Sequence, residues 1–482
     1  MSEHFDVLII GAGLSGIGAA VHLRRGVPHK SVAILEARDA IGGTWDLFRY
    51  PGIRSDSDMF TLGYAFKPWK DQKAIADGPA ILDYIRETAR EYDVERLVRF
   101  GHCVKSASWS SADARWTVEV ERTGTGETQQ LTCGFLYGCT GYYDYDAGYT
   151  PDFPGLSRYR GRLVHPQKWT PDVDYTDKRV VVIGSGATAV TLVPELAKKA
   201  AHVTMLQRSP TYILSRPAED PIANALRERL PAQVAYGITR WKNVVMSTFL
   251  YEFAQRRPAR AKGWLLEQVQ KALGPDYDIS RHFTPRYDPW DQRLCLVPDA
   301  DLFEALRTGA ASVVTDTIDT FTEEGIRLTS GEELKADLVV TATGLVLKFA
   351  GGMTLNVDGR AIASQDLINY KGAMFADVPN FASAFGYTNA SWTLKADLTS
   401  AYVVRLLRRM DEVGARKCTP RLNDPEVQPS EFIGLASGYI ERARSFLPKQ
   451  GSKRPWRLYQ SYPLDIFLLR LSKLEDGSLE LQ

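Results

Sequence analysis

Two glycine-rich turns constrain this 482-residue chain more than any other feature of the sequence. The first, GAGLSG at 11–16, follows the apolar run 5–10 and precedes a second apolar run at 31–35. The other, GSGATA at 184–189, lies between two apolar runs in the same way. Short, continuous apolar runs are typical of strands that are buried on both faces. The sequence therefore predicts two strand–helix–strand units, about 170 residues apart.

The first unit has the residues of a dinucleotide site. Glycines let the backbone approach a pyrophosphate at the start of the helix. Glu36 ends the second strand, where a carboxylate accepts hydrogen bonds from ribose hydroxyls and repels a 2′-phosphate. We therefore predict FAD or NAD here, with contacts from Gly11, Gly13, Gly16 and Glu36.

The second unit lacks that carboxylate. Gln207 and Arg208 stand at the matching offset, and a guanidinium can hold a phosphate with two hydrogen bonds. The alternative is a solvated arginine on a loop. We predict NADPH at this site, with contacts from Ile183, Gly184, Ser185, Gly186, Ala187, Thr188, Ala189, Gln207 and Arg208.

The spacing of the two units predicts an α/β fold with two Rossmann-like dinucleotide-binding domains, the second inserted in the first. We expect residues 1–145 and 340–482 to form a discontinuous FAD domain and 146–339 to form the NADP domain. Residues 212–290 are rich in helix formers and aromatics and predict a helical insertion within the NADP domain. Two similar runs, CTG at 139–141 and ATG at 342–344, follow strands where the chain would cross between domains.

Composition argues against several function classes. Lys plus Arg number 59 and Asp plus Glu 58, so a net charge of +1 gives no global field for nucleic acid or an anionic membrane. Five scattered cysteines without a C-x-x-C motif fit a reducing cytoplasm and argue against a dithiol redox centre. The seven histidines show no pair at ligand spacing, so we predict no metal site. We expect neither a signal peptide nor a transmembrane segment.

Two further motifs carry a family resemblance. YRGRLVHPQKW at 159–169 resembles the F-x-G-x-x-x-H-x-x-x-W fingerprint of type I Baeyer–Villiger monooxygenases. Gly161, His165 and Trp169 match it, Tyr159 replaces Phe, and Thr170 replaces the Pro or Asp that follows. GGTWDLFRYPGIRSD at 42–56 matches the longer family signature at seven positions: Gly42, Gly43, Trp45, Tyr50, Pro51, Gly52 and Asp56.

The resemblance implies roles for particular residues. The active-site arginine of the family falls on Arg293, which Asp56 would orient by ion pairing. His165 would couple the two domains without direct chemistry. Gln292 stands where relatives often have a lysine that contacts NADP. Without that lysine, the selection of NADPH over NADH would depend more on Arg208. Further FAD contacts would come from Ser15, Gly43, Thr44, Trp45, Asp46, Asp56 and Val104, and further NADP contacts from Arg54 and Asp56.

The resemblance also implies an activity. Type I enzymes use FAD, NADPH and O₂ to convert ketones to esters or lactones through a C4a-peroxyflavin, and the same species can oxygenate sulfides or thioamides. The substrate implied is a small apolar ketone or sulfide. A heteroatom-hydroxylating flavin monooxygenase and an NADPH oxidase stay open, as does a flavoprotein that acts mainly through a partner surface.

The sequence leaves the substrate and the oligomeric state undecided. Five aromatics of the insertion either line an apolar pocket or pack between helices: Tyr236, Trp241, Phe249, Tyr251 and Phe253. The basic and aromatic stretch 448–460 either touches a membrane or partner peripherally or packs as a tail over the FAD domain.

Overall fold

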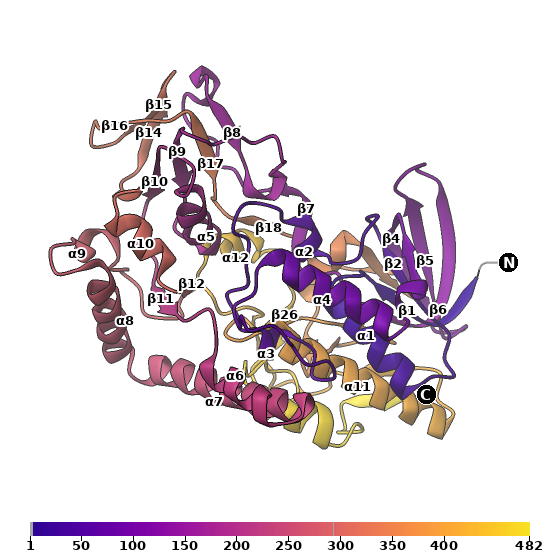
Figure 1. Ribbon diagram of the computed structural model, residues 1–482. Helices are drawn as coiled ribbons and strands as arrows, with labels where there is room; N and C mark the ends of the chain where they lie inside the picture. Colours follow the sequence, from indigo (N-terminus) through magenta and orange to yellow (C-terminus); the bar gives the residue numbers. More distant parts are fainter. Residues whose placement is uncertain (1–2, 293) are drawn as a thin grey trace.

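The computed structural model describes residues 3–292 and 294–482, and its core is two α/β units, each built on its own sheet (Figure 1). Within the described residues, the first sheet has nine strands in the order β20-β19-β4-β5-β6-β1-β2-β3, with β23 also paired to β6. Its strands are β1 (His4–Ile10), β2 (Val32–Glu36), β3 (Val98–Phe100), β4 (His102–Ser110), β5 (Arg115–Arg122), β6 (Thr128–Gly138), β19 (Thr354–Val357), β20 (Arg360–Ile362) and β23 (Phe381–Ser383).

The first glycine-rich turn lies at the centre of this sheet. β1 pairs in parallel with β2 on one side and with β6 on the other. Helix α1 (Leu14–Gly26) connects β1 to β2 and packs beside the long helix α11 (Trp392–Val413). The two helices approach closely, because a Cβ on Gly26 would lie 2.2 Å from Val404. The predicted strand–helix–strand unit is confirmed.

The second unit has a parallel sheet in the order β13-β10-β9-β17-β8. Helix α5 (Ala187–Leu196) connects β9 to β10, and α10 (Asp301–Arg307) packs beside α5. The five strands are β8 (Arg162–Val164), β9 (Arg179–Ile183), β10 (His202–Gln207), β13 (Ala311–Thr315) and β17 (Leu338–Thr341). The second Rossmann-like unit is thus also present.

The chain crosses between the units along two paired segments. β7 (Tyr143–Gly148) leaves the first unit, and β18 (Leu345–Leu347) returns to it antiparallel to β7. All strands of the second sheet lie between these two crossings in the sequence. The second unit is therefore inserted in the first, and the boundaries at 145/146 and 339/340 remain predictions.

The helical segment after residue 212 contacts both units. It contains α6 (Pro221–Arg229), α7 (Ala232–Arg256), α8 (Pro258–Leu273) and α9 (Ile279–His282), and it begins with β11 (Ile213–Arg216), which pairs with β12 (Cys295–Pro298). Tyr236 and Val244 of α7 join the apolar core of the first unit. Val269 and Leu273 of α8 join the core of the second. The segment is helical as predicted, but its helices bridge the two units.

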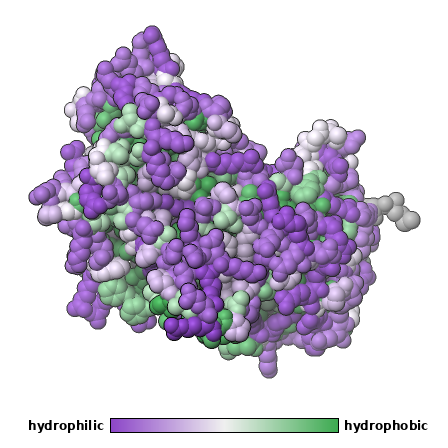
Figure 2. All heavy atoms as spheres, viewed as in Figure 1, coloured by the Kyte–Doolittle hydropathy of each residue, from purple (hydrophilic) through white to green (hydrophobic). Residues whose placement is uncertain are grey.

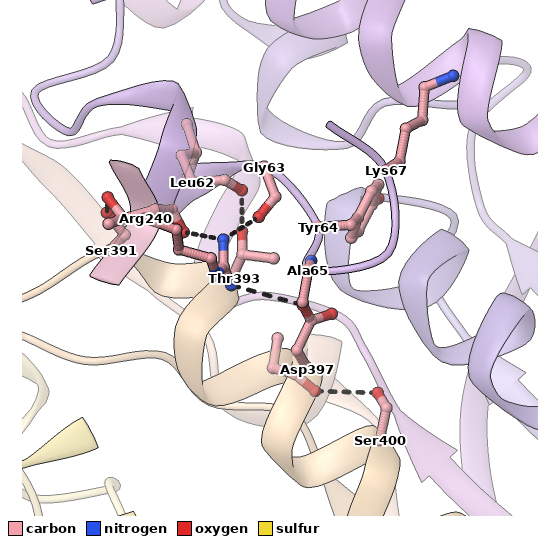
Figure 3. Close-up of polar contacts among 12 residues, drawn as sticks. Leu62, Gly63, Tyr64, Ala65, Lys67, Arg240, Ser391, Thr393, Asp397 and Ser400 are labelled. Atoms are coloured by element: carbon pink, nitrogen blue, oxygen red, sulfur yellow. Dashed lines mark hydrogen bonds and ion pairs between the residues drawn. The ribbon is translucent and has the colours of Figure 1, made fainter. Parts of the chain in front are cut away.

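A buried arginine anchors α7 to the first unit (Figure 3). Arg240 donates hydrogen bonds of 2.7 Å to the carbonyl oxygens of Phe60, in α3 (Met59–Leu62), and of Gly63. Its guanidinium also lies 3.6 Å from the carboxylate of Asp397 on α11. Burial opposes ionisation of Asp397, but contacts with His22 and Arg240 hold its pKa below the usual value. These contacts offset the cost of burying the charges.

Candidate functional site

One long cleft of about 1370 Å³ runs between the two units and is lined by both glycine-rich turns. A pocket for one small molecule is typically about 300–1,000 Å³, so this cleft has room for more than one ligand. The carboxyl ends of β1 and β9, which precede the two turns, both open into it. This is where open α/β sheets bind dinucleotides.

The first turn forms a tight cradle. Gly11 has φ +102°, and a Cβ there would lie 2.7 Å from the carbonyl oxygen of Cys139. A Cβ on Gly16 would lie 1.8 Å from the carbonyl oxygen of Gly11, so only glycine lets α1 start so close to β1. Gly11, Gly13 and Ser15 line the cleft, and Ser15 Oγ accepts a hydrogen bond of 2.7 Å from Trp392 Nε1.

Glu36 lies buried at the end of β2, in the wall of the cleft. Its Oε2 accepts a 2.7 Å hydrogen bond from the Ala12 N–H, and its Oε1 accepts one of 2.9 Å from the Arg38 N–H. A carboxylate has about four acceptor positions, so it can still receive ribose hydroxyls. The glycine cradle and this fixed carboxylate fit the FAD that the sequence predicts.

The signature loop 42–56 reaches from the first unit to the second. Gly43 lies against Gly13, because a Cβ on it would be 3.0 Å from the Gly13 Cα. Farther along, the Tyr50 side chain hydrogen-bonds to Thr188, and burial raises the pKa of Tyr50 to about 12. Arg54 then donates to Asp301 of α10 at 2.5 and 3.3 Å. The loop therefore contacts both glycine-rich units.

Two aspartates of this region have different surroundings. Asp56 is exposed and lines the cleft. Asp58 caps α3, where its Oδ1 accepts hydrogen bonds from the Thr61 N–H (3.0 Å) and from Asn243 Nδ2 (2.8 Å). Arg293, the arginine predicted to pair with Asp56, lies outside the described residues.

The second turn is also tight. Gly184 has φ +139°, and a Cβ there would lie 2.3 Å from the carbonyl oxygen of Ala342. Arg208 lines the cleft just beyond β10, where the predicted phosphate would lie. Gln207 is buried, and its Nε2 donates to the His282 carbonyl at 2.7 Å and to Thr315 Oγ1 at 2.9 Å.

Most of the predicted cofactor contacts line the cleft: Gly11, Gly13, Ser15, Glu36, Gly43, Thr44, Trp45, Arg54, Asp56, Val104, Ile183, Gly184, Ser185, Gly186, Ala187, Thr188 and Arg208. Four others lie behind its wall: Gly16, Asp46, Ala189 and Gln207. The buried Asp46 carboxylate forms ion pairs with Arg38, Arg49 and Arg86. Of these arginines, Arg38 lines the cleft. Asp46 itself does not line the cleft and is connected to it by its ion pair with Arg38.

His165 ties the crossing segments together. Its Nδ1 accepts a 3.1 Å hydrogen bond from the Gln167 N–H, so its Nε2 donates the proton in the 3.2 Å bond to the Gly344 carbonyl. Both bonds require a neutral ring, and burial lowers the pKa of His165 in agreement. His165 follows β8 and its bond reaches the residue before β18, while the coupling role that the family resemblance implies stays a prediction.

Sequence reasoning missed several residues of the cleft. Tyr142 directly precedes β7 and Tyr145 lies within it, whereas Trp392, Tyr439 and Arg442 come from the C-terminal third of the chain. No short motif marks Trp392, Tyr439 or Arg442, because these three reach the cleft only through the return of the chain along β18. The aromatic rings of Tyr142 and Trp392 stack on each other, with their centroids 5.3 Å apart.

Several undecided features of the sequence lie away from the cleft. The sequence left open whether five aromatic residues of the helical insertion line a pocket or pack between helices. Among the described residues, none of these five lines the cleft. In the stretch 448–460, Trp456 is buried against Tyr370, and Lys453 pairs with Asp424 and Glu426. Cys133 and Cys139 are buried free thiols whose pKa values burial raises; Cys133 lies away from the cleft, and Cys139 is part of its wall.

Comparisons with known proteins agree with this architecture. The model of the flavin-binding monooxygenase-like family matches residues 64–374, and that of an NAD(P)-binding Rossmann-like domain matches 9–74. The FAD-containing monooxygenase EthA of Mycobacterium tuberculosis is 53% identical over 480 residues, covering 99% of this chain and 98% of EthA.

Two solved structures share the fold across almost the whole chain. A steroid monooxygenase bound to NADP superposes with a TM-score of 0.76 at 23% identity, covering 99% of each chain. A cyclohexanone monooxygenase superposes with a TM-score of 0.74 at 20% identity, covering 100% of each.

Proposed function

Because the chain belongs to the flavin-binding monooxygenase-like family, we propose that it is a FAD- and NADPH-dependent Baeyer–Villiger monooxygenase. It converts small apolar ketones to esters or lactones and also oxygenates sulfides or thioamides. One observation carries the proposal: the Baeyer–Villiger signature loop 42–56 starts beside the first glycine cradle and ends against α10 of the second unit. A loop in this position contacts two dinucleotides at once.

The chain's own residues would bind the two cofactors at opposite ends of the cleft. The N–H groups of the first cradle and the Glu36 carboxylate hold FAD, and the second cradle with Arg208 holds NADPH. When bound, FAD reduced by NADPH supplies the activation of O₂ from which one oxygen atom enters the substrate. His165 keeps the crossing segments in register while both sites are occupied.

We assign the substrate end of the cleft to aromatic side chains near the two crossings. Tyr142, Tyr387, Trp392 and Tyr439 line it there, and such a wall favours apolar ligands. Arg293 supplies the positive charge that stabilises negative charge on oxygen as the ketone is attacked, and Asp56 orients that guanidinium. Gln292, its neighbour in the chain, lines the cleft.

The test is NADPH consumption by the purified FAD-loaded enzyme with linear, cyclic and aryl ketones and with thioethers, each product being identified. We expect esters or lactones from ketones and sulfoxides from thioethers. Sulfoxides without any ester or lactone would assign a heteroatom monooxygenase instead. NADPH oxidation that yields only hydrogen peroxide would assign an oxidase.

A further inference from the structure

Large apolar side chains gather on one surface of the molecule. Thirteen such side chains are exposed in the described chain, and ten of them lie on α6, α7 and the C-terminal helices α13 (Tyr462–Ile466) and η6 (Phe467–Leu471). We call these ten the apolar face: Ile222, Val234, Ile238, Trp241, Val245, Met246, Phe249, Leu464, Phe467 and Leu471. A monomer rarely exposes so many apolar residues together without a binding partner.

The apolar face follows helical periodicity. Residues 234, 238, 241, 245 and 249 recur every three or four positions, so they form one stripe along α7. Phe249 is 71% exposed and Val245 62%. The opposite side of α7 carries Tyr236 and Arg240, which anchor it to the first unit. The helix is therefore apolar on its outer side as well as its inner side.

The two parts of the apolar face are continuous. The ring of Trp241 on α7 lies 5.9 Å from that of Tyr462, the first residue of α13. Leu464, Phe467 and Leu471 then extend the surface along the C-terminal helices. Figure 2 shows hydrophobic atoms along the lower edge of the molecule, where Figure 1 places α7 and the yellow C-terminal segment.

Positive charge borders this face. The net charge of +1 is unevenly distributed, because residues 221–274 contain nine Lys and Arg but only three carboxylates. Beyond Phe249, the segment 253–266 contains Arg256, Arg257, Arg260 and Lys262 and no carboxylate. In the described part of the chain, neither Arg257 nor Arg260 forms an ion pair, and the same holds for Arg470 beside Leu471.

We propose that the apolar face and its bordering arginines bind the surface of an anionic lipid bilayer. A helix lying in the membrane interface presents Trp, Phe and aliphatic residues to the acyl chains, and Lys or Arg to the headgroups. No helix among the described residues is long and apolar enough to cross a membrane, so the contact is peripheral. A second copy of the chain fits the face less well, because a two-fold contact would bring the same apolar helix with its unpaired arginines onto itself.

The test is co-sedimentation of the FAD-loaded enzyme with vesicles of phosphatidylcholine alone or mixed with phosphatidylglycerol. We expect binding to the anionic vesicles that weakens as salt is added. The double variant Val245→Ser/Phe249→Ser should bind roughly tenfold more weakly or worse. Arg257→Gln/Arg260→Gln should lower the preference for anionic lipid. Val413→Ser, on an exposed residue outside the face, is the matched control and should bind like the wild type.

Three results would overturn the proposal. The wild type could remain in the supernatant with anionic vesicles at low salt. The Val245/Phe249 variant, shown to be folded by its bound flavin and thermal unfolding, could bind as tightly as the wild type. Analytical ultracentrifugation could show a wild-type dimer that this variant converts to a monomer, which would assign the face to a second copy.

Discussion

The guanidinium of Arg54 forms a two-pronged ion pair with the carboxylate of Asp301, with N···O distances of 2.5 and 3.3 Å. Arg54 lies near the end of the signature loop of the first unit, and Asp301 begins α10 of the second. The pair thus joins the two nucleotide-binding units beside the cleft. Both side chains are largely shielded from solvent, at 14% and 31% exposed, so the pair matters more than a surface ion pair.

Breaking this pair should weaken the junction between the units. We expect Asp301→Ala to lower the free energy of unfolding by about 2 kcal/mol, because it leaves the largely shielded Arg54 charge without its partner. Thermal and denaturant unfolding measure this. Asp319→Ala removes the exposed partner of Arg327 and should cost less than about 1 kcal/mol. Equal losses in the two variants would contradict the structural role of Arg54–Asp301.

The His165–Gly344 bond predicts a pH dependence of stability. The pKa of His165 is lowered from 6.5 in the folded state, so the unfolded chain binds the proton more readily. Its contribution is fully present above pH 6.5 and is lost as pH falls through the lower folded-state pKa. In His165→Gln, a neutral amide can make both hydrogen bonds, so stability between pH 7 and pH 5 should fall less steeply than in the wild type. Identical slopes in denaturant unfolding would show that His165 does not titrate in this way.

Arg208 and Gln207 should differ in their effects on the cofactor. Arg208→Ala should raise the KM for NADPH about tenfold or more and leave that for NADH nearly unchanged, because only NADPH carries the 2′-phosphate. Gln207→Ala should lower the melting temperature without changing the NADPH/NADH ratio, since its amide holds His282 and Thr315. A ratio that moves in Gln207→Ala and not in Arg208→Ala would reverse these assignments.

Glu36 should determine flavin affinity. Glu36→Gln keeps the size of the side chain but loses the charge and one acceptor, so we expect the Kd for FAD to rise about tenfold. Flavin fluorescence during dilution measures the release. Asp39→Asn is the control, because Asp39 is exposed and lies outside the wall of the cleft. Unchanged affinity in Glu36→Gln would remove Glu36 from the site.

Both Rossmann-like units could be predicted from the sequence because their strands are continuous apolar runs that meet glycine turns. The side-chain directions at Gln207 and Arg208 could not, because neighbouring residues at the end of a strand point to opposite sides. Trp392 and Tyr439 were missed because the return of the chain, and not a local pattern, brings them to the cleft. The packing of α7 against the first unit and of α8 against the second was missed because α7, which is apolar on two sides, has no single face to assign.

The central claim is that this chain inserts one oxygen atom of O₂ into a ketone and that Arg293 is required for the insertion. The most direct measurement is the reaction of wild type and Arg293→Ala with NADPH, a cyclic ketone and ¹⁸O₂, followed by mass spectrometry of the product. We predict a lactone with one ¹⁸O atom from the wild type, and flavin reduction by NADPH without lactone from the variant. Labelled lactone at the wild-type rate from Arg293→Ala, or hydrogen peroxide without lactone from the wild type, would contradict the account.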